Sequence, residues 1–467
     1  MKFTRSAKFA LAAVASAALA VTLLTPAQAA TRSTVILHET NPITGLNCSL
    51  SATNSTTCSA VNYVQGAGFN YYNNKKELVK NTVFGSYKIV KNSASDFRVQ
   101  YTVNPGRVWS DGTSIDGVDL LLSHVLSSDA YSIAAGLGDP KSKTNPPAFN
   151  GLGYSGVYSN NIVGEPTLSA DHMSVTLRYK NPIANWDIYG PGPAAVHSLV
   201  LMAEGKTKLG TAAENMAAKE RFYKAFQSYD TAALKKIGAL WSKAYNINKI
   251  DGSTNPLLLV GNGPFMIKSA VPNGAVTLVR NPKYTSGPKV KALKTVVFKV
   301  IGDGTAAAQA LKNGEIDIYA GQPTGDAVNQ LKAMAPAVKI IGGDQAVYEH
   351  VDIRVGTAFG TTDTYNGVFA GNSQKALDLR TAVLLAWPRE EIMEKIVRPI
   401  NSSAQLMNSL MYFNAEPGYK DIIAKSGVSK FTEGTQASRN AKALALVQKY
   451  FPETTAAKPT VKIKLLF

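Results

Sequence analysis

Cysteine and histidine are scarce in this sequence, and their scarcity excludes several kinds of chemistry. There are two cysteines and five histidines among 467 residues. The histidines lack the spacing of metal ligands, and neither an H-E-x-x-H zinc motif nor a G-x-S-x-G nucleophile elbow occurs. Asp111, Asp116 and Asp119 could be paired catalytic carboxylates, but a turn aspartate followed by helix-capping acids is the favoured interpretation. We therefore expect no enzyme, no metal site and no cofactor.

Long apolar runs are missing too, with one exception at the N-terminus. Residues Phe9–Leu24 form an alanine-rich apolar run, and Ala27-Gln28-Ala29 is a small-x-small cleavage site. Three basic residues precede the run: Lys2, Arg5 and Lys8. This pattern is typical of a secretory signal peptide, here over residues 1–29. The alternative is an uncleaved anchor helix, for which the run is short.

A lipid-attachment cysteine is also absent near the cleavage site. The mature chain should therefore begin at Ala30 and carry no lipid. We predict an exported protein that is periplasmic or extracellular, or retained in the cell envelope by other means.

Acidic residues are in deficit. The sequence has 32 Asp and Glu against 49 Lys and Arg, a formal charge of +17, and the leader holds three of the positive charges and no acid, leaving +14. Such a charge favours anionic partners without identifying them. The basic stretch around Lys289, Lys291, Lys294 and Lys299 has no interleaved aromatic platform, which favours a solvated face over nucleic-acid binding.

Cys48 and Cys58 are the two cysteines of the chain. In an exported protein, so close a pair predicts one disulfide bond. The segment between them, residues 49–57, is rich in Ser, Thr and Asn. We expect the bridge to restrain a segment that has little packing of its own.

Strand and helix patterns are mixed along the whole chain. Runs of β-prone residues predict strands over 34–37, 84–90, 97–103, 174–179, 265–269, 275–279, 295–300 and 461–467. Apolar residues at helical spacing predict helices over 116–127, 212–226, 231–243, 305–312, 376–387, 389–397 and 438–450. Together with 45% hydrophobic residues, this mixture predicts an α/β or α+β protein with a large core, divided into two to four domains.

Four short motifs stand in a fixed order. They are Trp109-Ser-Asp-Gly112, Gly263-Pro-Phe265, Arg280-Asn-Pro-Lys-Tyr284 and Leu311-Lys-Asn-Gly-Glu-Ile-Asp317. In this order and at this spacing, the set resembles the extracellular solute-binding proteins of family 5, the oligopeptide/dipeptide class that feeds ABC importers. The motifs are mostly structural, so they indicate the fold rather than the ligand.

The resemblance implies an α/β fold of the two-lobe, type II periplasmic-binding-protein kind, with an extra subdomain in the first lobe. We expect lobe 1 with the inserted subdomain over 30–301 and lobe 2 over 302–467. It also implies a monomeric receptor that closes on a peptide and delivers it to an ABC permease in the membrane. The alternative within the fold is a receptor for an oligosaccharide or another small solute, and the alternative from another class is a secreted hydrolase.

Five ligand contacts are implied by position along the family pattern. Phe69, Asn70 and Tyr71 stand where the family has an aromatic segment facing the cleft; a buried strand is the alternative. Asn41 follows the first predicted strand, where the family approaches ligand, or it simply forms a turn. Trp387 could offer an apolar wall or belong to the core.

A second group of contacts is expected on the second lobe. Tyr348, Glu349, His350 and Asp352 lie on a β-patterned stretch that faces the ligand in the family. Glu349 or Asp352 could pair with a cationic group such as a peptide amino terminus. The alternative is an exposed or ion-paired strand.

The last predicted strand, Val461–Phe467, reaches the end of the sequence, whereas family members continue and complete the second lobe. From this we expect a truncated member whose second lobe, from Gly302, is incomplete and exposes apolar surface. A complete but shortened receptor is the alternative.

Overall fold

The computed structural model describes residues 32–75, 77–183, 186–188, 190–321, 324–341, 350–356, 365–410 and 412–463. The predicted signal peptide over 1–29 and the predicted contacts Tyr348 and Glu349 lie outside the described residues. Helices and strands are interleaved along the described chain, so the predicted mixed α/β class is confirmed. None of the helices described is long and apolar enough to cross a membrane.

One four-stranded sheet, the β1 sheet, joins distant parts of the chain. Its order is β1 (Thr34–Glu39), β10 (Thr295–Val300), β9 (Ala275–Arg280) and β8 (Phe265–Ala270). β1 pairs with β10 in parallel, with Thr34 opposite Thr295, and the other pairs are antiparallel. Leu278 and Phe298 point to one face and pack with Val61 of α1 (Thr56–Gln65) in a shared core. In β9 and β10 buried and half-exposed residues alternate along most of the strand, as expected for strands with one face on a core.

A second four-stranded sheet, the β5 sheet, is antiparallel throughout. Its order is β4 (Gly85–Ser93), β5 (Asp96–Val103), β7 (Ser174–Tyr179) and β6 (Thr167–Leu168). Every second residue of β5 from Phe97 to Val103 is almost fully buried. The helices that contribute most to this core are α2 (Val118–Val125), α5 (Val196–Ala203), α6 (Ala212–Ser228) and α7 (Thr231–Lys243).

Shorter elements connect and flank these two sheets. They are the hairpin of β2 (Asn70–Tyr72) and β3 (Leu78–Lys80), the helices α3 (Asp129–Ala134) and α4 (Val157–Asn161), and the 3₁₀ helix η1 (Pro256–Leu259). After β10 the chain forms α8 (Gly304–Lys312) and α9 (Gly325–Ala333).

The C-terminal part of the described chain is helical. It consists of α10 (Gln374–Ala386), α11 (Arg389–Ile392), the π-helix η2 (Met393–Val397), α12 (Tyr419–Ser426), α13 (Ser429–Thr432) and α14 (Gln436–Gln448). Ala382 and Leu385 of α10 pack on Ala443 of α14 in a small separate core.

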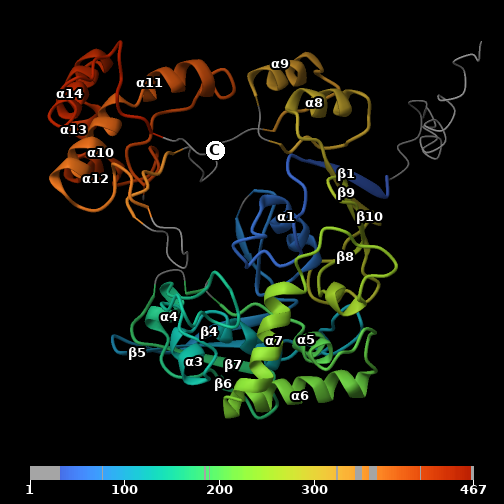
Figure 1. The fold of residues 1–467 in the computed structure, drawn as a ribbon. Coiled ribbons are helices and arrows are strands. Elements are labelled where there is room, and N and C mark those ends of the chain that lie inside the picture. The colour runs from blue at the N-terminus through green and yellow to red at the C-terminus, as the bar shows by residue number, and fades with distance from the viewer. Residues whose placement is uncertain are drawn as a thin grey trace, which may run out of the picture.

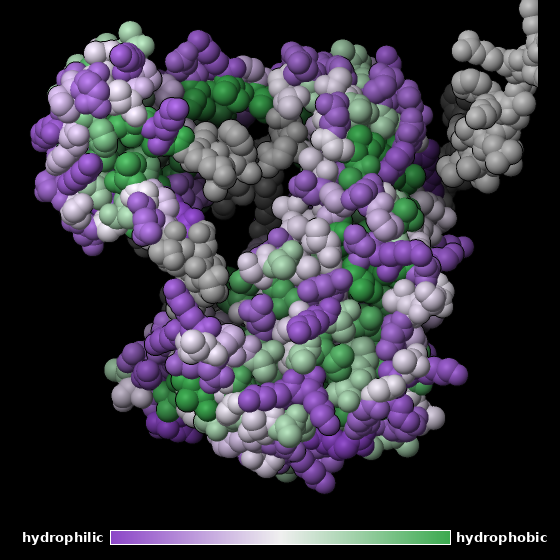
Figure 2. Space-filling model, in the orientation of Figure 1, coloured by the Kyte–Doolittle hydropathy of each residue, from purple (hydrophilic) through white to green (hydrophobic). Residues whose placement is uncertain are grey.

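The helices and strands form three groups in space. The β5 sheet and α3 to α7 lie together, the β1 sheet lies beside α1 with α8 and α9 beyond it, and α10 to α14 form a separate group (Figure 1). The space-filling view shows an open hollow between the C-terminal helices and the other groups (Figure 2).

The structure corrects two expectations, one about the segment between the two cysteines and one about the last predicted strand. Residues 49–57 were expected to pack little, yet Leu50, Thr53 and Thr57 within this segment are buried. The strand predicted over 461–467 is not formed at 461–463, and the rest of it lies outside the described residues. A β-prone run forms a strand only beside a partner, and the described chain pairs no strand with residues 461–463.

Candidate functional site

The acids that follow Trp109 form a buried ion-pair cluster. The Lys219 ammonium of α6 lies 2.8 Å from Asp119 Oδ2 and 2.8 Å from Asp116 Oδ2, and the Trp109 indole N–H donates to Asp119 Oδ2 at 3.3 Å. Burial opposes the charge of Lys219, but Asp119 and Asp116 outweigh burial and raise the pKa of the Lys219 ammonium. The carboxylates therefore anchor α6 to the turn, which favours the structural interpretation of these acids over the catalytic one.

Asp111 links two of the sequence motifs. Its Oδ2 lies 2.9 Å from His197 Nε2 and accepts a 3.1 Å hydrogen bond from the Asn215 amide, while its carbonyl oxygen accepts from Lys283 at 2.6 Å. Burial opposes the charge of the Asp111 carboxylate, but hydrogen bonds from His197 and Thr113 more than offset it and lower the pKa of Asp111. Since Lys283 belongs to the Arg-Asn-Pro motif, these motifs are structural neighbours.

The predicted aromatic segment lies at the edge of the larger core. The Phe69 side chain is 6% exposed and meets Phe84 edge-on, with ring centroids 5.0 Å apart. Asn70 donates to the Asp187 carbonyl at 2.7 Å, and Tyr71 is half-buried in β2. The structure thus places Phe69 in the core, as in the alternative of a buried strand. Ligand contact by these three residues stays a prediction.

The other predicted contacts lie in separate places. Asn41 is exposed, and its carbonyl accepts from the Thr57 hydroxyl at 2.7 Å. Trp387 is half-buried at the end of α10. His350 and Asp352 are exposed, with 3.4 Å between His350 Nε2 and Asp352 Oδ2. None of them lines the cavity described next, and their ligand role also stays a prediction.

A cavity of about 330 Å³ opens beside the β5 sheet. We call it the α2 cavity, because α2 and the residues after it form one wall. Sixteen residues line it: Ser49, Leu120, Ser123, His124, Leu126, Ser127, Gly151, Leu152, Gly153, Tyr158, Pro166, Leu177, Ile188, Gly190, Pro191 and Trp241. This volume falls in the range of about 300–1,000 Å³ that is usual for small-molecule pockets. The α2 cavity is therefore the candidate binding site on the first part of the chain.

The floor of the α2 cavity holds a hydrogen-bonded histidine. His124 Nδ1 lies 2.8 Å from the Tyr158 hydroxyl, and His124 Nε2 lies 2.6 Å from Glu165 Oε2. Burial raises the pKa of the Tyr158 hydroxyl well above its usual range, with Tyr179 and Glu165 adding to the effect. Tyr158 therefore presents a neutral phenol to the cavity.

Close contacts with the residues that follow α2 and with Trp241 fix the Gly151–Gly153 segment of the cavity wall. A side-chain carbon at Gly153 would stand 2.5 Å from Ser127 Oγ, and one at Gly151 would stand 3.2 Å from the Trp241 ring. The Gly-x-Gly pattern of this segment was a detectable signal, because glycine allows two chain segments to approach closely. The pattern did not indicate what the segment approaches, so sequence reasoning missed the cavity.

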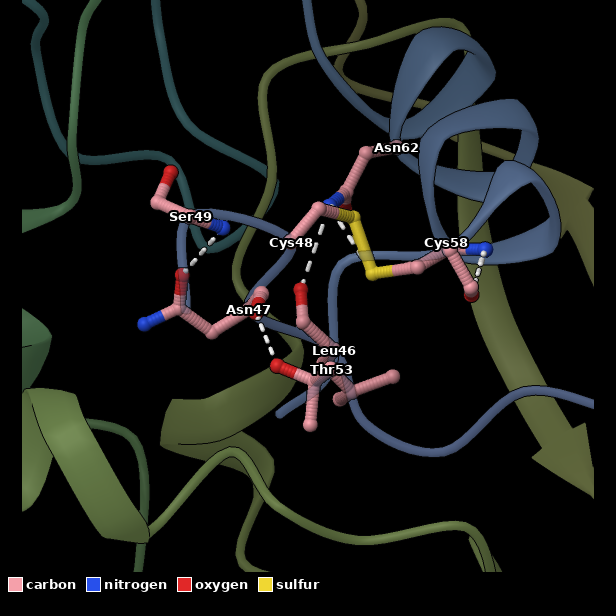
Figure 3. The surroundings of a disulfide bond; sticks show 8 residues. Leu46, Asn47, Cys48, Ser49, Thr53, Cys58 and Asn62 are labelled. Atoms are coloured by element: carbon pink, nitrogen blue, oxygen red, sulfur yellow. Dashed lines mark hydrogen bonds between the residues drawn. A yellow bond between two sulfur atoms is a disulfide. The ribbon is translucent and has the colours of Figure 1, made fainter. Parts of the chain in front are cut away.

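The disulfide holds one edge of the α2 cavity in place. Cys48 and Cys58 are joined with their Cα atoms 5.7 Å apart, which confirms the predicted bridge. Asn62 of α1 donates to Cys48 Sγ at 2.8 Å and to the Leu46 carbonyl at 3.1 Å (Figure 3). The next residue, Ser49, lines the cavity, and its carbonyl accepts from the Leu152 N–H at 3.0 Å. The bridge thus ties α1 to the rim of the cavity.

No group of His, Cys, Asp or Glu side chains in the described ranges is arranged to hold a metal ion. The chemistry that the described site offers is recognition through apolar contacts and hydrogen bonds.

Comparison with known proteins places the chain in a class of binding proteins. Residues 90–449 match the bacterial extracellular solute-binding proteins, family 5 Middle. The chain is also 30% identical over 128 residues to the probable D,D-dipeptide-binding periplasmic protein DdpA of Escherichia coli K12, a match that covers 25% of this chain and 24% of DdpA.

Solved structures show the same fold. The periplasmic EDTA-binding protein EppA superposes with a TM-score of 0.56 at 20% identity, covering 89% of this chain and 63% of EppA. OppA of Burkholderia pseudomallei gives a TM-score of 0.53 at 14% identity, covering 89% of this chain and 66% of OppA. The chain therefore covers less than two thirds of either structure.

The chain belongs to the family 5 extracellular solute-binding proteins, because the family match spans most of its length. The predicted resemblance and the predicted two-lobe, type II α/β fold are confirmed.

Proposed function

We propose that this protein is a solute receptor that captures peptides between its lobes and delivers them to an ABC permease. The observation that carries the proposal is the family match over residues 90–449. The ligands of similar proteins support this ligand class: DdpA is named for a D,D-dipeptide, and MppA of Escherichia coli, which superposes with a TM-score of 0.51, is described as a murein tripeptide binding protein. The receptor acts by binding alone, as an exported, unlipidated monomer without enzymatic activity.

The proposed organisation follows the predicted division at Ile301. Lobe 1 with its subdomain spans 30–301, and lobe 2 follows. The strands β1 and β10 meet at this division, where His38 Nε2 lies 2.8 Å from the Ile301 carbonyl oxygen. Two neighbouring strands that leave a sheet together are a suitable hinge, since a few residues can absorb the change in backbone angles. A ligand that contacts both lobes would shift the population towards the closed form.

A thermal-shift panel tests the ligand class. A ligand that binds the folded state alone raises the melting temperature by mass action. We expect a peptide mixture to raise the melting temperature, and oligosaccharides and metal–EDTA complexes to leave it unchanged. A rise with oligosaccharide or metal–EDTA but not with peptides would replace the peptide proposal by the alternative of another small solute.

Variants of the predicted second-lobe acids test how the amino terminus is held. If an acid pairs with the peptide amino terminus, Glu349→Ala and Asp352→Ala should reduce the thermal shift given by free peptides but not by N-acetylated ones. The exposed Glu453, outside the predicted site, provides the matched control Glu453→Ala. Unchanged shifts in both variants would remove these two acids from the site.

A further inference from the structure

The α2 cavity is neutral on every described wall. Among its sixteen lining residues there is no Asp, Glu, Lys or Arg, although the chain as a whole carries a formal charge of +17. Its one residue of basic type, His124, is 1% exposed and already contacts the Tyr158 hydroxyl and Glu165. A charged ligand group would lose hydration here without gaining an opposite charge from the wall.

The cavity lining is more apolar than polar, and its deep part is preformed. Leu120 and Leu177 are each 1% exposed and Trp241 is 7% exposed, so the deep surface is fixed by the core that these residues share. Ser123 is held by a 2.9 Å hydrogen bond from its hydroxyl to the Gly192 carbonyl. A rigid apolar wall favours binding, because little conformational freedom is lost when a ligand group enters.

Two aliphatic side chains stand at the rim. Leu152 is 53% exposed and Ile188 is 51% exposed, and they come from separate loops, so both can be covered by an entering group. Large apolar side chains left open beside a concave site are typical of binding surfaces. The rim therefore offers apolar area that only a ligand would remove from water.

We propose that the α2 cavity takes an uncharged, apolar ligand group of the size of a leucine or phenylalanine side chain. This inference names a ligand group for the proposed receptor, and in that sense it rests on the proposed function. The volume of about 330 Å³ has room for one such side chain together with the adjoining amide groups. Ser49, Ser123 and Ser127 also line the cavity, and hydroxyls are side chains that can hydrogen-bond amides.

Blocked amino-acid amides test the cavity without depending on peptide transport. We would titrate the mature chain with N-acetylphenylalaninamide, N-acetylleucinamide, N-acetylserinamide and N-acetyllysinamide, and record calorimetric affinity and tryptophan fluorescence. Burying a side chain of this kind corresponds to about a ten- to hundred-fold preference. We expect the first two amides to bind that much more tightly than the last two. Their fluorescence response should disappear in Trp241→Phe, because Trp241 lines the cavity, and calorimetry follows binding in that variant.

Rim variants locate the binding site. Leu152→Ser and Ile188→Ser should each weaken binding of the apolar amides about three- to ten-fold, because each removes a large part of the apolar contact. Ile133→Ser is the matched control, since Ile133 is 56% exposed and does not line the cavity. Equal melting temperatures for the three variants would exclude unfolding as the cause.

The outcomes separate this inference from the proposed function. Apolar amides that bind in a manner dependent on Leu152 and Ile188 support the inference even if no peptide raises the melting temperature, in which case the peptide proposal alone fails. The inference is overturned if no apolar amide binds, if lysine or serine amides bind equally well, or if binding is the same in the rim variants and the control. Peptide stabilisation alongside any of these results would leave the receptor proposal standing.

Discussion

Removal of the Lys219 side chain should destabilise the protein strongly. Its ammonium neutralises two carboxylates at 2.8 Å each, and its side chain is 2% exposed. In Lys219→Met, two carboxylates would lose their cation, one of them on the fully buried Asp119, and breaking a buried pair from one side costs about 3–5 kcal/mol. We expect that loss in the free energy of unfolding, measured by urea titration.

The control for this prediction is Lys224→Met on the same helix. The Lys224 side chain is 72% exposed and lies 3.6 Å from Glu220, so its loss should change stability by less than about 0.5 kcal/mol. An equal loss of unfolding free energy in Lys219→Met and Lys224→Met would show that the buried ion-pair cluster stabilises the protein no more than an exposed ion pair.

Asp96 gives a prediction about pH. Hydrogen bonds from Arg98 and Lys91, together with Arg178, lower the pKa of the Asp96 carboxyl well below its usual range. A lowered pKa stabilises the folded state above the usual carboxyl pKa, and this contribution is lost as pH falls through the lowered value. The Asp96→Asn variant should therefore have a lower melting temperature than the unchanged protein at pH 7. This difference in melting temperature should become smaller at acid pH. A difference that is constant between pH 7 and pH 3 would contradict this assignment.

At the scale of elements, the disulfide and the loops around it make the clearest prediction. Closing a loop of this length stabilises a protein by about 2–3 kcal/mol in the chain-entropy account. The bridge also positions Ser49, which contacts Leu152 at the rim of the α2 cavity. Replacing Cys48 and Cys58 by serine should lower the melting temperature and also weaken binding of apolar amides. Unchanged affinity at temperatures where the variant is folded would show that the rim does not depend on the bridge.

Elements with a strong local pattern were predictable from the sequence. The limits predicted for β7, β10 and α7 match the structure to the residue. In β7 apolar and polar residues alternate, β10 is rich in β-branched residues, and α7 begins after Asp230, whose carboxylate accepts from the Ala233 N–H. By contrast, α1 was not predicted, because its apolar residues are few and its N-terminus is rich in Ser and Thr. Tertiary packing and the disulfide stabilise α1, whose own sequence has a weak helical pattern.

The candidate site was far less predictable than the fold. The α2 cavity is lined from several separate segments, including the disulfide loop, α2, the Gly151–Gly153 loop and the residues Ile188, Gly190 and Pro191. A single sequence carries no information on which loops meet in space. A strand or helix, by contrast, can be predicted from the spacing of its own apolar residues. Phe69 illustrates the limit, because its aromatic character suits a buried core and a ligand contact equally well.

At the scale of the whole molecule, the described chain combines the family fold with an unevenly distributed charge. Residues 32–301 contain 28 Lys and Arg against 16 Asp and Glu, whereas residues 302–467 contain 18 against 16. The excess is therefore concentrated in the first part, where the neutral α2 cavity lies. This positive charge should speed the approach of anionic partners, and salt should screen the effect. The neutral α2 cavity should determine which ligand group is bound.

The central claim is that this chain is a receptor that binds peptides, and native mass spectrometry of the exported protein tests it most directly. The protein would be purified without denaturation, and its bound molecules released and sequenced. We predict co-purified peptides, enriched in leucine or phenylalanine and displaced by an added apolar peptide. A preparation that carries oligosaccharides or other non-peptide solutes, or that stays empty and takes up no peptide from a mixture, would contradict the claim.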